Sequence, residues 1–111
     1  EGWDTSYSKW LEVSKINHKD LLFIFSVGGG NLKKKVSVNL INAVKYAKKN
    51  KSKIISIIGK KDSFCGKYSD SAIVIPLISK ERITPHTEGF QAIIWHLIIS
   101  HSILKKNKTK W

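Results

Sequence analysis

The chemistry that this chain could support is most visible at Ser26 and at the three glycines Gly28–Gly30 that follow it closely. A serine hydroxyl can hydrogen-bond an anion, and glycines allow positive φ and close approach of backbone N–H groups to a bulky ligand. A helix beginning shortly afterwards would add unpaired N–H donors and a partial positive charge. These residues predict a phosphate site, with a plain strand-to-helix turn as the alternative explanation of the glycines.

Two nucleotide-binding motifs fail at this loop. A Walker motif needs GKS or GKT, whereas Asn31 and Leu32 follow the glycines. A dinucleotide fingerprint needs a third spaced glycine, where the chain has Lys33, and an acid at the end of the next strand, where it has Gly59. We therefore expect no nucleotide cofactor.

Length and composition predict one domain. The chain has 111 residues, of which 41% are hydrophobic, enough for a core of its own. It begins at Glu1 and contains no methionine, so we expect a fragment whose missing part lies before Glu1.

The net charge of +12 does not by itself predict a nucleic-acid partner. Arg82 is the one arginine, and base-edge recognition favours the arginine fork over lysine. The lysines cluster beside the expected helices and strands, where solvated charge is common: residues 33–35, 48–53, 60–61 and a basic tail at about 105–111. We expect no nucleic-acid binding.

Cys65 is the one cysteine, so no disulfide forms within the chain and a reducing, cytoplasmic compartment is expected. A structural thiol is favoured over a catalytic one, because its neighbours offer no paired base. The most apolar run, Ala92–Leu104, is shorter than the roughly 20 residues needed to cross a bilayer, so no membrane association is expected.

Hydrophobic spacing predicts an alternation of helices and strands. A first helix, Ser6 to about Ser14, carries an apolar stripe of Tyr7, Trp10 and Leu11 that we expect in the core. The remaining elements are a strand at Leu21–Val27 typical of one covered on both faces, a helix at Ser37–Asn50, a strand at Ile54–Ile58, a short helix within Lys61–Ser69, a strand at Ala72–Ile75 and a helix from Thr84 or Thr87 to Leu104. This order predicts an α/β fold, a three-layer αβα sandwich with a parallel sheet. Ligands of such folds lie beyond the carboxyl ends of the strands, where Ser26–Gly30 falls.

Nearly the whole chain resembles the sugar isomerase (SIS) domain family, in particular its phosphoheptose isomerase branch. Members show an apolar strand, a phosphate loop of the form S-T-S-G-N-S and a helix that begins A-N-V-I-x-A. Here Ser26–Gly29 resembles the start of that loop, and Ser37–Ala43 resembles its last serine and the helix. Later segments also match, Lys53–Lys61 the strand V-I-x-L-T-G-K and Tyr68–Pro76 the segment A-D-x-x-I-x-V-P. The chain departs from the family by an insertion around Gly30–Val36 and by Gly28, where serine is common.

The resemblance implies a flavodoxin-like, Rossmannoid SIS domain over residues 1–111, incomplete at its N-terminus, and a phosphorylated sugar as ligand. Its phosphate would be held by Ser26, Gly28, Gly29 and Ser37. For Ser37, a plain helix N-cap is a compatible alternative.

The resemblance also implies that Glu88 and His96 act in catalysis, His96 as a catalytic histidine and both as ligands of a divalent metal such as zinc. Eight residues of helix span about 12 Å, so both cannot ligate one metal from the same helical run. Either Glu88 precedes the helix, with Thr87 as its cap, or the two serve one site from different subunits, or only one is functional. The alternative for His96 is a histidine within the core or an interface. The family's general base lies on a segment before Glu1.

Three hypotheses follow. The parent protein is a ketose–aldose isomerase converting sedoheptulose 7-phosphate for bacterial heptose synthesis, or a non-catalytic, regulatory sugar-phosphate-binding module, or an interaction domain without a ligand. The apolar helix Ala92–Leu104 favours a homo-oligomer, a dimer or a tetramer.

Overall fold

Three parallel strands lie between two layers of helices in a computed structural model, which describes residues 2–108 and 110. In chain order the elements are a short 3-10 turn at Trp3–Thr5, α1 (Ser6–Val13), β1 (Leu21–Ser26), α2 (Val38–Lys49), β2 (Lys53–Ile58), α3 (Phe64–Tyr68), β3 (Ser71–Val74), a 3-10 turn at Lys80–Arg82 and α4 (Ile83–Ser100). The predicted order of helices and strands is confirmed. Glu1 of the domain expected over 1–111, and positions 109 and 111 of the expected basic tail, lie outside the described residues.

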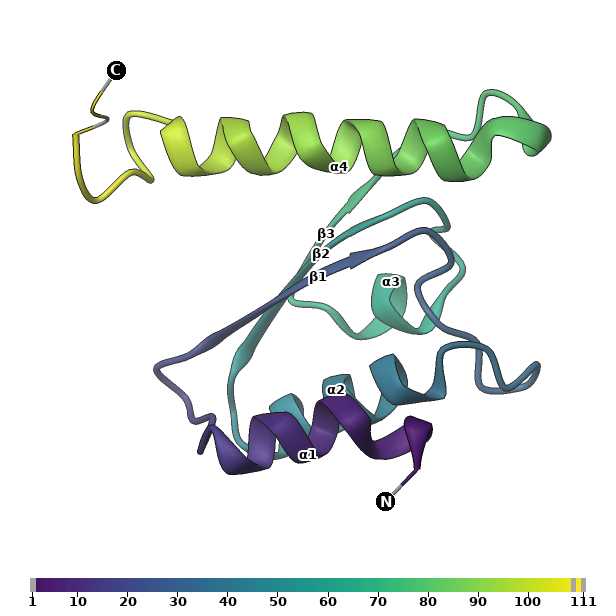
Figure 1. Ribbon diagram of the computed structural model, residues 1–111, viewed down its shortest axis with the longest axis vertical. Coiled ribbons are helices and arrows are strands. Elements are labelled where there is room, and N and C mark those ends of the chain that lie inside the picture. The colour runs from purple at the N-terminus through teal and green to yellow at the C-terminus, as the bar shows by residue number, and fades with distance from the viewer. Residues whose placement is uncertain (1, 109, 111) are drawn as a thin grey trace.

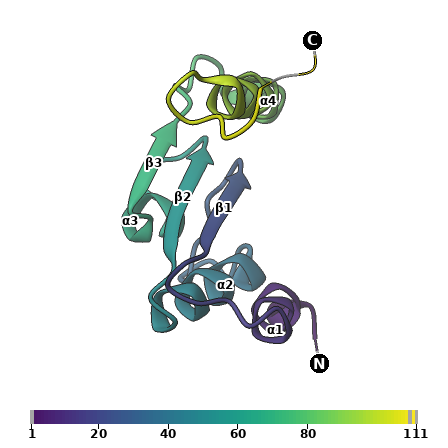
Figure 2. The same cartoon turned by 90° about the vertical axis from the view of Figure 1, so that its left-hand side faces the viewer.

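The sheet has the order β1-β2-β3, with both pairs parallel. The register pairs Ser26 with Ile58 and Ile58 with Val74, so the three strands end level with one another. Figure 2 shows the three arrows side by side and pointing the same way. The loops that follow the strands therefore leave from one edge of the sheet, which we call the carboxyl edge.

The helices form unequal layers on the two faces of the sheet. Helices α1, α2 and α3 lie on one side, and α4 crosses the other side alone (Figure 1). This arrangement confirms the predicted αβα class with a parallel sheet.

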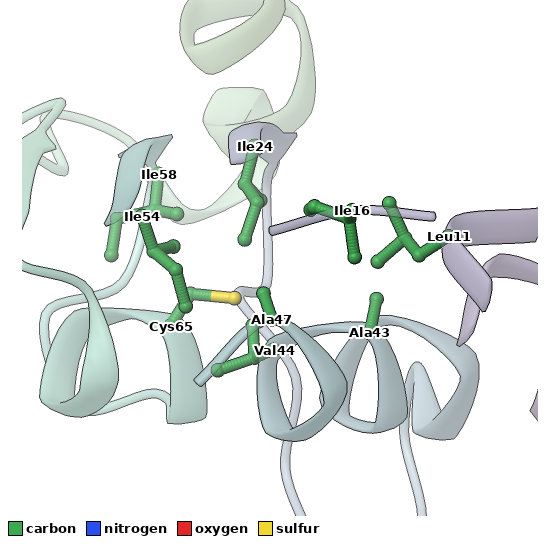
Figure 3. Packing of buried hydrophobic residues seen from close by; sticks show 9 residues of the cluster. All are labelled: Leu11, Ile16, Ile24, Ala43, Val44, Ala47, Ile54, Ile58 and Cys65. Atoms are coloured by element: carbon green, nitrogen blue, oxygen red, sulfur yellow. The ribbon is translucent and has the colours of Figure 1, made fainter. Parts of the chain in front are cut away.

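The hydrophobic core lies between β1, β2 and the helices on the α2 side. Its strand side chains are isoleucines, whose branched Cβ suits a pleated and buried surface. Small residues of α2 let that helix lie close to the sheet. Figure 3 shows the cluster, in which the buried members are Leu11, Ile16, Ile24, Ala43, Val44, Ala47, Ile54, Ile58 and Cys65.

Two expectations about burial are wrong. Strand β1 is an edge strand and is not covered along both faces, since Leu21 is 52% exposed and Phe25 is 45% exposed. Of the apolar stripe on α1, only Leu11 enters the core, while Trp10 is 66% exposed. The reason is that α1 packs chiefly on α2, and Tyr7 and Trp10 line an open groove beside β1 instead of being covered.

The last helix begins and ends earlier than the sequence predicts. Its first residue is Ile83, and Pro85 is tolerated in the first turn because an N–H there has no partner within the helix. Thr87 is therefore inside α4 and buried, and the expectation that it caps the helix is wrong. At the other end, Ser100 Oγ donates to the His96 carbonyl at 2.6 Å and His101 is extended, so the helix stops before Leu104.

No helix within the described residues is long and apolar enough to cross a membrane.

Candidate functional site: the glycine loop at the carboxyl edge

The glycine loop, Val27–Gly30, leaves β1 at the carboxyl edge and is fixed against α3. The Gly29 N–H donates to Ser26 Oγ at 2.9 Å. The Gly29 carbonyl accepts from the Cys65 N–H at 2.8 Å, and the Gly30 carbonyl accepts from the Phe64 N–H at 2.9 Å. Two backbone bonds thus join the Gly29–Gly30 end of the loop to the first turn of α3, and Ser26 Oγ holds the Gly29 N–H.

Two of the three glycines are required by the fold itself. Gly29 and Gly30 have φ of 65° and 79°, in the left-handed region. A Cβ on Gly29 would also collide with the Ser63 side chain, and one on Gly30 would lie 2.9 Å from Ile41 Cγ1. The strand-to-helix turn alone therefore explains why residues 29 and 30 are glycines.

Gly28 is different, because neither conformation nor packing requires a glycine there. Its φ is not positive, and a Cβ built on it meets nothing within 4 Å. Within the described part of the chain, its N–H has no hydrogen-bond partner. Gly28 therefore offers a backbone N–H that no group of the described residues accepts, a donor suited to an oxyanion.

The insertion between the glycines and Ser37 folds out as a hairpin, Asn31–Val36. The Asn31 N–H donates to the Val36 carbonyl at 3.0 Å, and the Val36 N–H donates back to the Asn31 carbonyl at 3.0 Å. Such a reciprocal pair holds its Cα atoms about 5.5 Å apart. Gly30 and Ser37 therefore enter and leave the hairpin side by side, and the insertion does not separate the loop from the helix.

Ser37 precedes α2 in a strained conformation, with φ 52° and ψ 49°. Its carbonyl accepts from the Ile41 N–H at 3.1 Å, but its hydroxyl makes no capping bond. Ser37 therefore occupies the N-cap position of α2, as the alternative interpretation expected, but it caps through its carbonyl and not through its hydroxyl. A left-handed serine with an uncommitted hydroxyl at a helix start is the kind of strain found at binding sites.

The carboxyl edge is also electropositive. The N-terminus of the twelve-residue α2 contributes a partial positive charge. The hairpin carries Lys33, Lys34 and Lys35, and Lys60 and Lys61 follow β2. The edge can therefore attract an anion as well as bind it.

A solved structure shares this fold. The chain superimposes on the structure of phosphoheptose isomerase GmhA from Neisseria gonorrhoeae with a TM-score of 0.63 and 23% sequence identity. The match covers 86% of this chain and 49% of that chain, so this chain spans about half the length of the isomerase. No protein-family model matches the sequence, and no curated protein matches it. The likeness therefore supports the fold.

Glu88 and His96 both lie on α4 and are both exposed. The alternative in which Glu88 precedes the helix is wrong, because α4 begins at Ile83. Glu88 lines a cavity of about 460 Å³ between α4 and β1, which His96 does not line. His96 instead stacks on the ring of Trp95 at 3.8 Å.

A metal site within one copy of this chain is not seen among the described residues. Residues 2–108 and 110 contain no group of three or more His, Cys, Asp or Glu side chains placed to hold one. A metal bound between Glu88 of one copy and His96 of another stays a prediction.

Cys65 lies beneath the glycine loop as a structural thiol. It is fully buried, and burial raises its pKa to about 11. A thiol with so high a pKa is protonated near neutral pH and is a poor nucleophile. The expectation of a structural cysteine is confirmed.

Two residues of α4 dock this helix on the sheet: Gln91, which the sequence did not single out, and Thr87, which it suggested as a helix cap. Gln91 Nε2 donates to the Ile57 carbonyl at 2.8 Å in a buried position. Thr87 lies so near Gly59 that a Cβ there would come within 2.6 Å of Thr87 Oγ1. Both contacts join residues far apart in the sequence. The one local feature that could have pointed to them was Gly59, a glycine directly after an apolar strand.

Proposed function

We propose that this chain binds a phosphorylated sugar at the carboxyl edge. Its phosphate lies between the Gly28 N–H, the hydroxyls of Ser26 and Ser37 and the first turn of α2. Hydroxyls and backbone amides bind a phosphate dianion without reacting with it, and the helix terminus favours its charge. The Gly29 amide orients Ser26 through their hydrogen bond rather than facing the ligand.

The observation that carries this proposal is the hairpin closure, which returns Ser37 to the side of the glycine loop. This closure supports treating the two halves of the expected phosphate loop, Ser26–Gly29 and Ser37, as one site despite the seven intervening residues.

The test exploits the strain at Ser37. Replacing Ser37 by glycine relieves the left-handed backbone yet removes the hydroxyl, so Ser37→Gly is expected to fold at least as well as the parent chain. We expect sedoheptulose 7-phosphate to raise the melting temperature of the parent and to have a much smaller effect on Ser37→Gly. An equal rise in both proteins would exclude Ser37 from the site. Unphosphorylated sedoheptulose is the ligand control.

We further propose that the parent protein is a ketose–aldose isomerase acting on sedoheptulose 7-phosphate. The likeness of fold to a phosphoheptose isomerase and the phosphate site support this assignment. Isomerisation needs a base that removes a proton from carbon and an acid that protonates the carbonyl oxygen, and a histidine can serve near neutral pH. Formation of aldose phosphate from this substrate, lost in His96→Ala, is the expected result. No aldose phosphate from the parent protein would overturn it.

A non-catalytic phosphosugar-binding module is the second candidate, and the position of His96 favours it. Thr87 contacts the carboxyl edge at Gly59, and His96 lies nine residues further, about 13 Å along the helix axis. On one chain, His96 is thus far from the proposed phosphate. This candidate predicts that His96→Ala leaves the ligand-induced rise in melting temperature intact and that no turnover occurs.

A further inference from the structure

A second feature of the carboxyl edge is a cleft of about 550 Å³ between the hairpin and the segment that joins β2 to α3. Lysines from three separate segments line it: Lys33 from the hairpin, Lys61 from the β2–α3 loop and Lys67 from α3. We call this the lysine cleft. Asp62 is the one acid among its lining residues, so its local charge is strongly positive.

The walls of the lysine cleft are fixed by hydrogen bonds of backbone N–H groups to backbone and side-chain oxygens. The hairpin is closed by the Asn31 and Val36 pair, and the Lys34 N–H donates to Asn31 Oδ1 at 2.9 Å. Opposite, Ser63 Oγ caps α3 by accepting from the Gly66 N–H at 3.1 Å. The bond from the Phe64 N–H to the Gly30 carbonyl joins the two walls at the base of the cleft. The lysine backbones are therefore held in place before any ligand arrives.

Among residues 2–108 and 110, no acid forms an ion pair with these lysines. The ion pairs of the described residues are Lys9 with Glu12 and Lys53 with Asp70, both away from the cleft. Lys67 lies over the Tyr68 ring at 5.4 Å, an interaction that leaves its charge uncompensated by an acid. Three exposed lysines on one concave surface raise its positive potential and attract anions to it.

We propose that the lysine cleft binds a second anion, the clustered phosphate charge of a pyrophosphate-bearing ligand. Lysines suit this ligand because they act as mobile point charges that can meet several phosphate oxygens. The cleft is distinct from the phosphosugar site, which uses Ser26, Gly28 and Ser37, although Gly30 borders both. The size of the cleft is within the usual range for small-molecule sites.

The experiment is calorimetric titration of the chain with inorganic pyrophosphate at fixed ionic strength. Each of Lys33→Ala, Lys61→Ala and Lys67→Ala is expected to weaken binding by roughly three- to fivefold, as suits exposed charges. The combined triple variant is expected to weaken it by more than any single variant does, and not by the simple product of the three effects, because the lysines share one ligand. Lys45→Ala is the matched control, because Lys45 is exposed on α2 and does not line the cleft.

Equal weakening by Lys45→Ala would show attraction to the overall charge alone and would overturn the proposal. So would the absence of saturable binding. The Ser37→Gly variant separates this site from the phosphosugar site, since it should lose the effect of sedoheptulose 7-phosphate and keep pyrophosphate binding. If Ser37→Gly abolishes pyrophosphate binding while the lysine variants keep it, the anion lies at the glycine loop and the lysine cleft is not a site.

Discussion

The two faces of the sheet are built in different ways. The α2 face buries a contiguous core that joins α1, α2, α3 and the strands (Figure 3). On the α4 face, the buried residues of the long helix are Thr87 and Gln91, both polar. Apolar residues of α4 remain open, with Phe90 48% exposed and Ile93 and Leu97 each 60% exposed. The stability of this chain is therefore concentrated on the α2 face, which also carries the glycine loop.

The largest effect expected from this contrast is at Ile54. It is fully buried on the α2 face, so Ile54→Ala leaves a cavity and should cost about 4 kcal/mol of unfolding free energy. Ile93→Ala makes the same chemical change on the exposed side of α4 and should shift stability by less than about 0.5 kcal/mol. Urea unfolding of both variants measures the difference. Similar losses would show that the α4 face is as well packed as the other.

The next largest loss of unfolding free energy is expected in the glycine loop, where it joins the α2 face. Gly29→Ala places a methyl group in the left-handed region and against Ser63, for an expected cost of about 2–4 kcal/mol. Gly28→Ala is the control, since its methyl group enters open space and should be nearly neutral for stability. Thermal unfolding compares them, and a destabilised Gly28→Ala would contradict the proposed difference between the two glycines.

A smaller effect is expected where α4 docks. Gln91→Ala removes the buried bond to the Ile57 carbonyl and should cost about 1–2 kcal/mol. The loss should be greatest in the hydrogen-exchange protection of α4, because few other contacts hold that helix. Ser100→Ala, which removes an exposed hydroxyl from the same helix, should leave that protection unchanged. Uniform loss across β1 and α2 in Gln91→Ala would mean that the two faces unfold as one unit.

The smallest effect is expected at the amino ends of the strands. The Ile54 N–H donates to Asp70 Oδ2 at 2.8 Å and, together with the nearby Lys53, lowers the pKa of the Asp70 carboxyl. A carboxyl whose pKa is lower in the folded chain stabilises it above the ordinary pKa, and this contribution is lost as pH falls through the folded pKa. Asp70→Asn should therefore unfold with a shallower acid dependence. If the stability of Asp70→Asn and that of the parent chain depended on pH in the same way, Asp70 would not contribute to the acid sensitivity of the fold.

The sequence predicted the elements of both faces because their signals are local. Short isoleucine-rich runs and a helical apolar stripe identify β2 and α2 without knowledge of the fold. The prediction that Trp10 is buried was wrong, because helical spacing identifies the apolar face of a helix but not whether a neighbouring element covers that face. The predicted start of α4 was also too late in the chain, because Pro85 fits within the first turn of this helix.

Part of the candidate site could be recognised in the sequence for the same reason. Ser26 and the glycines form a continuous segment whose position after a strand can be read directly. The left-handed conformation of Ser37 and the openness around Gly28 could not be predicted, because they follow from the hairpin and from the packing of α3. The lysine cleft was missed because Lys33, Lys61 and Lys67 meet only in the folded chain.

The most direct test of the central claim is a titration of isotope-labelled chain with sedoheptulose 7-phosphate, followed by amide chemical shifts. The account predicts that the largest shifts occur at Gly28 and in the first turn of α2, at Val38 and Asn39. Their absence in Ser37→Gly would place the phosphate beside that hydroxyl. Shifts confined to α4 around His96, with Gly28 and α2 unchanged, would contradict the claim that the glycine loop binds the phosphate.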